Sequence, residues 1–161
     1  MENNSENISI RPAFQSEWQD AMRLAWRTFL QFDAPDYSKE GIDNFNDFIT
    51  DNGIYQKFCE GKFPLFVALE NDRIVGIIAL RNDNHISLLF VEAESHRKGI
   101  GEKLIAYAKE YVITELCMQS LSVFAAPYAV NFYKKCGFAP IDEEKTRDGI
   151  RFTPMEWKQK R

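Results

Sequence analysis

Cysteine and histidine are scarce in this chain of 161 residues, which contains three cysteines and two histidines. The cysteines, Cys59, Cys117 and Cys136, are odd in number and show no C-x-x-C spacing. This pattern indicates neither a disulfide framework nor a zinc cluster, so we expect no metal site. A chain without a disulfide framework suits a reducing compartment, and we expect a cytoplasmic location.

Long apolar runs and a strong excess of one charge are also missing. No segment approaches the ~20 apolar residues that a membrane-spanning helix needs, and residues 1–6 are polar and acidic, unlike a secretory signal. The formal net charge is −4, which provides no broad positive field for phosphate groups. We therefore expect neither a membrane nor nucleic acid as a partner.

What is present is the composition of an ordinary globular protein, with 45% hydrophobic and 27% charged residues. The length predicts one domain over residues 1–161. Hydrophobic spacing predicts a mixed α/β (α+β) fold with a central, mainly antiparallel sheet of about seven strands flanked by about four helices. The expected strands cover residues 8–11, 65–70, 74–80, 85–91, 121–125, 138–141 and 150–157, and the expected helices residues 16–32, 38–50, 99–117 and 128–136.

The most informative segment is residues 88–104, where an apolar strand runs through a loop with two glycines directly into a long helix. The N-terminus of a helix carries unpaired N–H groups and favours negative charge, so this arrangement is typical of an anion cradle. Gly99 and Gly101 allow close approach to the backbone, and Arg97 and Lys98 add positive charge. The alternative is that the two glycines only begin a helix.

Two phosphate-binding motifs are excluded by the residues around Gly101. A P-loop requires Gly-Lys followed by Ser or Thr, whereas Gly101 is followed by Glu102 and Lys103. A dinucleotide-binding fingerprint requires a third glycine and a parallel strand–helix–strand unit, whereas this strand ends an antiparallel meander.

Two motifs resemble those of the GNAT superfamily of N-acetyltransferases. The first is the pyrophosphate loop, Gln/Arg-x-x-Gly-x-Gly/Ala, which His96-Arg97-Lys98-Gly99-Ile100-Gly101 matches except at its first position. The second is Phe-Tyr-x-x-x-Gly-Phe, matched by residues 132–138, and residues 148–156 resemble the last strand of a bacterial branch. Together with the order of elements, the resemblance covers nearly the whole chain.

The resemblance implies acetyl-CoA as the acyl donor, with its pantetheine arm between two diverging strands. Two departures from the family pattern affect this arm: Ala126 replaces a frequent asparagine, for which Asn131 is the expected substitute, and Ala93 replaces a frequent proline. The residues expected to bind the coenzyme are Leu89, Phe90, Val91, His96, Arg97, Lys98, Gly99, Ile100, Gly101, Glu102 and Asn131.

The resemblance also implies that Tyr133 is the general acid that protonates the departing thiolate. Without the motif, the interpretation of Tyr133 as a core residue beside Phe132 is favoured, and its place in the motif reverses this preference. Glu92, directly after the strand, is the predicted general base for an amine acceptor, and its alternative is a solvated surface carboxylate. No histidine neighbours a cysteine in the sequence, so direct attack in a ternary complex is favoured over an acetyl-cysteine intermediate.

The acceptor is the least determined part of the prediction. Aromatic residues crowd residues 29–63, where they either fill the core or line an acceptor cleft: Phe29, Phe32, Tyr37, Phe45, Phe48, Tyr55, Phe58 and Phe63. We expect the acceptor to be an amine of a small molecule or a peptide. The sequence leaves open whether the chain forms a homodimer. The alternative function is a non-catalytic acyl-CoA-binding or sensor domain of the same fold.

Overall fold

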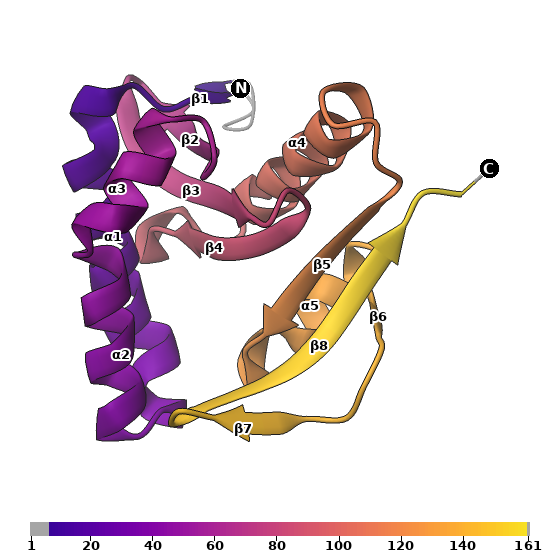
Figure 1. The fold of residues 1–161 in the computed structure, drawn as a ribbon. Helices are drawn as coiled ribbons and strands as arrows, with labels where there is room; N and C mark the ends of the chain where they lie inside the picture. Colours follow the sequence, from indigo (N-terminus) through magenta and orange to yellow (C-terminus); the bar gives the residue numbers. More distant parts are fainter. Residues whose placement is uncertain (1–6, 161) are drawn as a thin grey trace.

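The computed structural model describes residues 7–160, so the polar segment of residues 1–6 lies outside the described part. The described residues form five α-helices and eight strands (Figure 1). The helices are α1 (Trp18–Thr28), α2 (Lys39–Ile49), α3 (Asn52–Cys59), α4 (Ile100–Thr114) and α5 (Val130–Lys135). The strands are β1 (Ile8–Pro12), β2 (Leu65–Glu70), β3 (Arg73–Arg81), β4 (His85–Val91), β5 (Ser120–Ala125), β6 (Ala139–Pro140), β7 (Lys145–Arg147) and β8 (Ile150–Lys158). Within this part of the chain, no helix has the length and apolar character needed to cross a membrane.

The strands follow the order β1-β2-β3-β4-β5-β8-β6, and β7 pairs with β8 beside this path. Only β4 and β5 pair in parallel among the described strands, which confirms the predicted mixed, mainly antiparallel sheet. The β2–β3 turn uses Asn71 and Asp72, whose φ angles are 51° and 65°. Two consecutive left-handed residues suit a tight hairpin, which is why this turn was readable in the sequence.

Helices cover both faces of the sheet and create two cores (Figure 1). Helices α1, α2 and α3 lie on one face, against inward residues such as Ile77 and Leu88. Helices α4 and α5 lie on the other, where Leu104 and Ala108 of α4 are fully buried. Successive residues of a strand point to opposite faces, so neighbouring residues of β3 serve different cores.

The predicted helix of residues 16–32 is shorter than its apolar spacing suggested. Helix α1 ends at Thr28, whose Oγ1 donates a hydrogen bond to the Leu24 carbonyl at 2.7 Å. A wider π-helical turn, Phe29–Asp33, follows, and a 3-10 turn, Ala34–Asp36, then contains Pro35. Such bonding of a threonine hydroxyl to the preceding turn bends helices, and π-helical turns change which way the following side chains point. Asp33 is thereby turned inward and is 8% exposed.

Helix α2 confirms the helix predicted at residues 38–50, and the Ser38 side chain caps it by accepting the N–H of Gly41 at 3.2 Å. Helix α3 was not predicted. It is capped by Asp51, which accepts the N–H of Gly53 at 2.8 Å. A helix of eight residues shows little hydrophobic periodicity, and packing of Phe58 on the Trp18 ring stabilises it.

The C-terminal region is divided more finely than predicted. The helix expected at residues 128–136 is a 3-10 turn, Pro127–Ala129, followed by α5. Strand β7 was not predicted and forms a hairpin with β8 through Asp148 and Gly149. The Gly149 carbonyl accepts the Ser38 N–H at 3.2 Å, and a Cβ on Gly149 would lie 2.1 Å from Ser38 Oγ. This close approach holds the hairpin against the start of α2.

Candidate active site

Strand β4 separates from β5 soon after the two strands meet, and they diverge in Figure 1. Parallel pairing covers only His85 with Ser122 and Ile86 with Val123, although β4 continues to Val91. Backbone groups beyond the pairing lose their ladder partners on that side. A ligand inserted between the strands would replace those partners.

Alternate residues at the end of β4 direct their backbone groups toward this gap. Glu92 donates its N–H to the Val75 carbonyl of β3 at 2.8 Å. Because backbone direction alternates along a strand, Phe90 also faces β3, whereas Leu89 and Val91 face the gap. These are the two residues expected to hold an extended arm.

Two cavities open at the gap. The first, of about 440 Å³, is lined by residues of β4, β5 and the α1–α2 region and by the β7–β8 hairpin. The second, of about 340 Å³, is lined by the end of β4, the following loop and the first turn of α4. Both cavities include Leu89, Tyr128, Ala129 and Tyr133 in their walls. Two ligands bound in these cavities would therefore be neighbours.

The loop before α4 presents backbone donors to the second cavity. Arg97 and Gly99 adopt left-handed φ angles of 72° and 73°, and α4 begins at Ile100. Lys103 donates its N–H to the Gly99 carbonyl at 3.0 Å. The N–H groups of residues 100–102 precede this first helical hydrogen bond, so they are free of helical acceptors. Together with the helix dipole, they form an anion-binding end.

Gly101 has a spatial reason to be glycine. A Cβ at this position would lie 3.0 Å from Cζ of Phe132, tighter than an ordinary contact. Gly101 also lines the second cavity, so any side chain there would enter the space between α4 and α5.

Most residues predicted to bind the coenzyme line the second cavity: Leu89, Val91, His96, Arg97, Gly99, Ile100, Gly101 and Glu102. Phe90 lines the first cavity instead. Lys98 and Asn131 line neither of these two cavities. The Lys98 Nζ pairs with Glu70 of β2 at 3.0 Å, and Asn131 is exposed on α5.

Two buried polar atoms without a hydrogen-bond partner mark the two cavities. Within the described residues, the only such side-chain atoms are Ser95 Oγ and Arg81 Nε. Ser95 lines the second cavity and Arg81 the first. Buried polar groups are normally satisfied, so an exception in a cavity wall indicates a place where a bound molecule contributes. Sequence analysis missed both residues.

Tyr133 is 5% exposed and belongs to the wall shared by the two cavities. Its ring packs edge-on against Phe132 and Phe138, each with centroids 5.4 Å away. Burial, and next the charge of Asp33, raise the pKa of the Tyr133 hydroxyl, so it stays protonated at neutral pH. Tyr133 is therefore both a core residue and a cavity residue, and its role as general acid stays a prediction.

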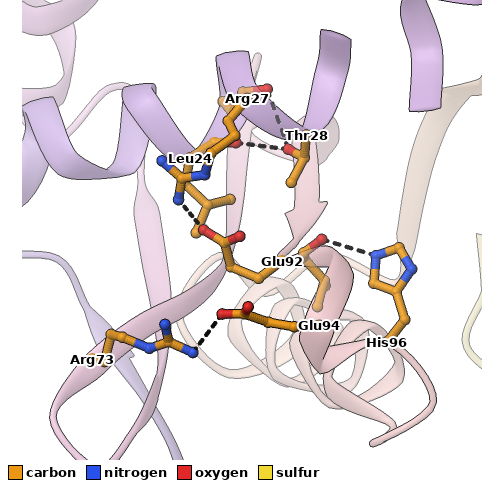
Figure 2. Close-up of polar contacts among 9 residues, drawn as sticks. Leu24, Arg27, Thr28, Arg73, Glu92, Glu94 and His96 are labelled. Carbon is orange, nitrogen blue, oxygen red and sulfur yellow. Dashed lines mark hydrogen bonds and ion pairs between the residues drawn. The ribbon is translucent and has the colours of Figure 1, made fainter. Parts of the chain in front are cut away.

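Glu92 points toward Arg27 of α1, as Figure 2 shows, and it lines neither of the two cavities. Its carboxylate forms an ion pair with Arg27 of α1. Nearby, Glu94 pairs with Arg73 at 2.8 Å. The two ion pairs tie the loop after β4 to α1 and β3.

Asp33 is the buried carboxylate of the first cavity. Its Oδ1 accepts the hydroxyl of Tyr128 at 2.7 Å, and no cationic side chain among the described residues pairs with it. Burial raises its pKa to about 6, against the opposing effect of the Tyr128 hydrogen bond. Nearby Tyr37 lines the same cavity, and burial followed by the charge of Asp33 raises its pKa.

The aromatic residues of the helical region divide between cavity and core. Phe29, Tyr37, Phe45 and Phe48 line the first cavity. The Phe32 ring lies against His96 at 4.8 Å. The remaining three pack around Trp18 or within the same core: Tyr55, Phe58 and Phe63. The four cavity residues also belong to the core or pack against it, and their role in an acceptor cleft stays a prediction.

The chain matches the model of the acetyltransferase (GNAT) domain family over residues 33–159. It belongs to this family. Among curated proteins, no match was found.

Solved structures of this GNAT protein's fold include one of a GCN5-related N-acetyltransferase from Rhodopseudomonas palustris. It is 22% identical, with a TM-score of 0.78, covering 93% of this chain and 94% of that one. The paia N-acetyltransferase from Thermoplasma acidophilum, in complex with coenzyme A, is 18% identical, with a TM-score of 0.79 and coverage of 94% and 98%. A spermidine N-acetyltransferase mutant from Vibrio cholerae is 17% identical, with a TM-score of 0.69 and coverage of 96% and 95%. At these identities, the likeness shows a shared fold.

The histidine at the first position of the GNAT loop motif has a local role in this structure. Its Nε2 lies 2.9 Å from the Val91 carbonyl oxygen (Figure 2). A carbonyl only accepts hydrogen bonds, so His96 donates through Nε2–H. This bond ties the loop to the end of β4 and leaves the Val91 N–H and the Leu89 backbone groups for a ligand.

Asp33 could have been noticed in the sequence of this GNAT protein by its unfavourable position. It ends a helical stretch before Pro35, where the negative end of the helix dipole disfavours a carboxylate. The helix predicted from the sequence ends at residue 32, and Asp33 is not among the predicted site residues. No comparable local signal marks Arg81 or Tyr128.

Proposed function

We propose that this GNAT protein transfers the acetyl group of acetyl-CoA to an amine of a small molecule or peptide by direct attack in a ternary complex. The observation that carries the proposal is the pair of cavities at the β4–β5 gap, which share Tyr133 in their walls. One cavity has the chemistry for a pyrophosphate, and the other has a carboxylate and aromatic walls suited to an amine.

The second cavity fits the coenzyme by three independent features. The N–H groups of residues 100–102 and the side chain of Arg97 offer positive partners for phosphate oxygens. The partnerless Ser95 hydroxyl adds a further polar group. Backbone groups of Leu89 and Val91 face the gap, where the amides of a pantetheine arm would bind. When bound, the thioester supplies an activated acetyl carbonyl and a thiolate leaving group.

The proposed reaction removes two protons from the nitrogen of an ammonium group, of which one is released to solvent, and it adds one proton to sulfur. Asp33 takes a proton from the acceptor ammonium, and the freed lone pair forms the new C–N bond as the C–S bond breaks. Tyr133 donates its proton to the departing thiolate and is reprotonated by the second proton lost from nitrogen. Asp33 then releases its proton to solvent, so the products are the amide, the free thiol and one proton.

The role of Glu92 as proton acceptor stays a prediction. We propose Asp33 as a second candidate because it lies in the wall of the first cavity. Glu92 is paired with Arg27 and lines neither of the two cavities, whereas Asp33 lines the first cavity and bonds Tyr128 of the shared wall. None of the three cysteines lines either cavity, which supports direct transfer.

Acetyl-CoA is expected to stabilise the folded protein, because the gap and the loop donors exist only in the native state. At about 100 times its dissociation constant it would add about 2.7 kcal/mol to the free energy of unfolding. Thermal melting with and without acetyl-CoA, together with calorimetric binding, measures this. Thiol release over a panel of amines then separates an enzyme from a sensor domain. If saturating acetyl-CoA neither raises the melting temperature nor binds in calorimetry, both the enzyme and the sensor domain are refuted.

Replacing Gly101 with aspartate is expected to weaken acetyl-CoA binding at least about 100-fold. The new side chain would enter the second cavity, where its charge opposes the phosphates and its Cβ meets Phe132. The measurement is calorimetric affinity for acetyl-CoA, after circular dichroism has shown that the variant folds. Ala106→Asp, which adds the same charge to an exposed position of α4, is the matched control. Near-normal affinity in folded Gly101→Asp would show that the phosphates bind elsewhere.

A further inference from the structure

We propose that the acceptor is a small amino-carboxylate, with its amine bound by Asp33 and its carboxylate, at the other end of the molecule, bound by Arg81. The proposal rests on the proposed function, because it names the acceptor class of that same site. It follows from two charged groups in the wall of the first cavity that have no ionic partner among residues 7–160.

Asp33 marks the end of the first cavity where the amine would bind. Only one of its carboxylate oxygens has a hydrogen-bond donor among the described residues, the Tyr128 hydroxyl, and it has no cationic partner there. A buried carboxylate without a counter-charge is costly, and an ammonium group from a ligand would supply the missing charge. Because Tyr128 also lines the second cavity, an amine at Asp33 lies beside the acetyl donor.

Arg81 brings a positive charge to the wall of the same cavity. It ends β3 and is partly buried, and its side chain forms no ion pair or hydrogen bond with any described residue. Its guanidinium lies over the Phe124 ring at 5.9 Å, a contact that leaves its donors unused. Guanidinium donors match a carboxylate in charge and in planar geometry. An anionic group on the acceptor therefore fits this part of the wall.

The two groups lie toward different ends of the cavity. Arg81 pairs in register with His85 at the start of β4, whereas Leu89, four residues further along β4, belongs to the wall shared with the second cavity. Four residues of a strand span about 13 Å. The Arg81 side chain shortens this span, but an acceptor must still separate its amine from its carboxylate by several bonds. An ω-amino acid such as 6-aminohexanoate meets this requirement.

The remaining charges of the first cavity do not favour a polyamine. Beside Asp33 and Arg81, its ionic residues are Arg147 and Asp148, both exposed at the β7–β8 turn and opposite in sign. A polyamine would place a second positive charge against Arg81. The aromatic walls of Phe29 and Phe45 suit the apolar chain between the two charged ends.

The test compares acceptors that differ only in the carboxylate, using thiol release from acetyl-CoA by the full-length protein. We expect kcat/KM for 6-aminohexanoate to exceed that for pentylamine and for spermidine about 10- to 100-fold, the effect of one charge-assisted contact. Glycine, whose amine and carboxylate are adjacent, should be poor. Equal values for 6-aminohexanoate and pentylamine, or a preference for spermidine, would overturn the proposal.

Variants of Arg81 test whether this residue causes the preference for an acceptor with a carboxylate. Arg81→Met should lower kcat/KM for 6-aminohexanoate about 10- to 100-fold more than it lowers kcat/KM for pentylamine, whereas Arg81→Lys should retain part of the preference for 6-aminohexanoate. Arg23→Met, at an exposed arginine of α1 that lines neither active-site cavity, is the matched control. An equal loss for both acceptors in folded Arg81→Met would contradict the assignment. If Arg81→Met does not fold, Arg81→Lys and the acceptor comparison on the unaltered protein decide.

Failure of this proposal is distinguishable from failure of the proposed function. Acetylation of amines without any dependence on a carboxylate rejects the amino-carboxylate and leaves the acetyltransferase intact. If acetyl-CoA binds but no acceptor causes thiol release, both the amino-carboxylate proposal and the proposed acetyltransferase function are rejected.

Discussion

Replacing Tyr133 with phenylalanine is expected to lower turnover about 10²- to 10⁴-fold while leaving affinity for acetyl-CoA nearly unchanged. Tyr133 belongs to the wall shared by the two cavities, and the substitution removes only its hydroxyl and keeps the ring that packs on Phe132 and Phe138. Folding should therefore survive. Turnover with the preferred amine and calorimetric binding of acetyl-CoA are the two measurements.

Tyr107→Phe is the matched control, because Tyr107 packs against Phe66 and lines neither active-site cavity. With acyl donors whose thiols have a lower pKa, the loss of turnover in Tyr133→Phe should be smaller, since a better leaving group needs less proton donation. Unchanged turnover in folded Tyr133→Phe would assign this tyrosine to the core alone.

Replacing Asp33 with asparagine is expected to stabilise the protein at pH 7 and to lower turnover about 10²- to 10³-fold. The raised pKa of Asp33, about 6 against the ordinary 3.8, corresponds to about 3 kcal/mol of unfavourable free energy when the buried group is ionised. Asparagine keeps an acceptor for the Tyr128 hydroxyl and carries no charge. Urea denaturation gives the change in the free energy of unfolding.

The stabilisation by Asp33→Asn should depend on pH in a defined direction. The folded state holds the Asp33 proton more tightly than the unfolded state, so Asp33 lowers stability as pH rises from about 4 to about 6. The variant and the unaltered protein should therefore differ little at pH 4 and most above pH 6. A difference that stays constant over this range would show that Asp33 is not the group responsible.

The pH dependence of turnover distinguishes the two candidate proton acceptors. With Asp33 as acceptor, activity rises through about pH 6 in the unaltered protein, and this rise persists in Glu92→Gln but not in Asp33→Asn. The reverse outcome would support Glu92, the acceptor predicted from the sequence.

The local features of this protein were determined by its sequence. The loop from His96 to Gly101, the cap at Ser38 and the turn at residues 71–72 depend on residues within a few positions of one another. Hydrogen bonds to the nearest backbone groups and the conformational freedom of glycine and asparagine decide such features, and both are visible in a short stretch of sequence. The motif around Tyr133 was recognisable because it, too, lies in one short stretch, residues 132–138.

Only the tertiary structure decided which distant residues form the acceptor side. Asp33 meets Tyr128 across 95 positions because a π-helical turn after Thr28 turns the carboxylate inward, and Arg81 reaches the same cavity from the end of β3. Lys98, which the sequence predicts at the coenzyme, forms an ion pair with Glu70 of β2, a partner that no local pattern indicates. Register between strands and the packing of helices on the sheet determine these pairings, and both depend on the whole chain burying its apolar faces at once.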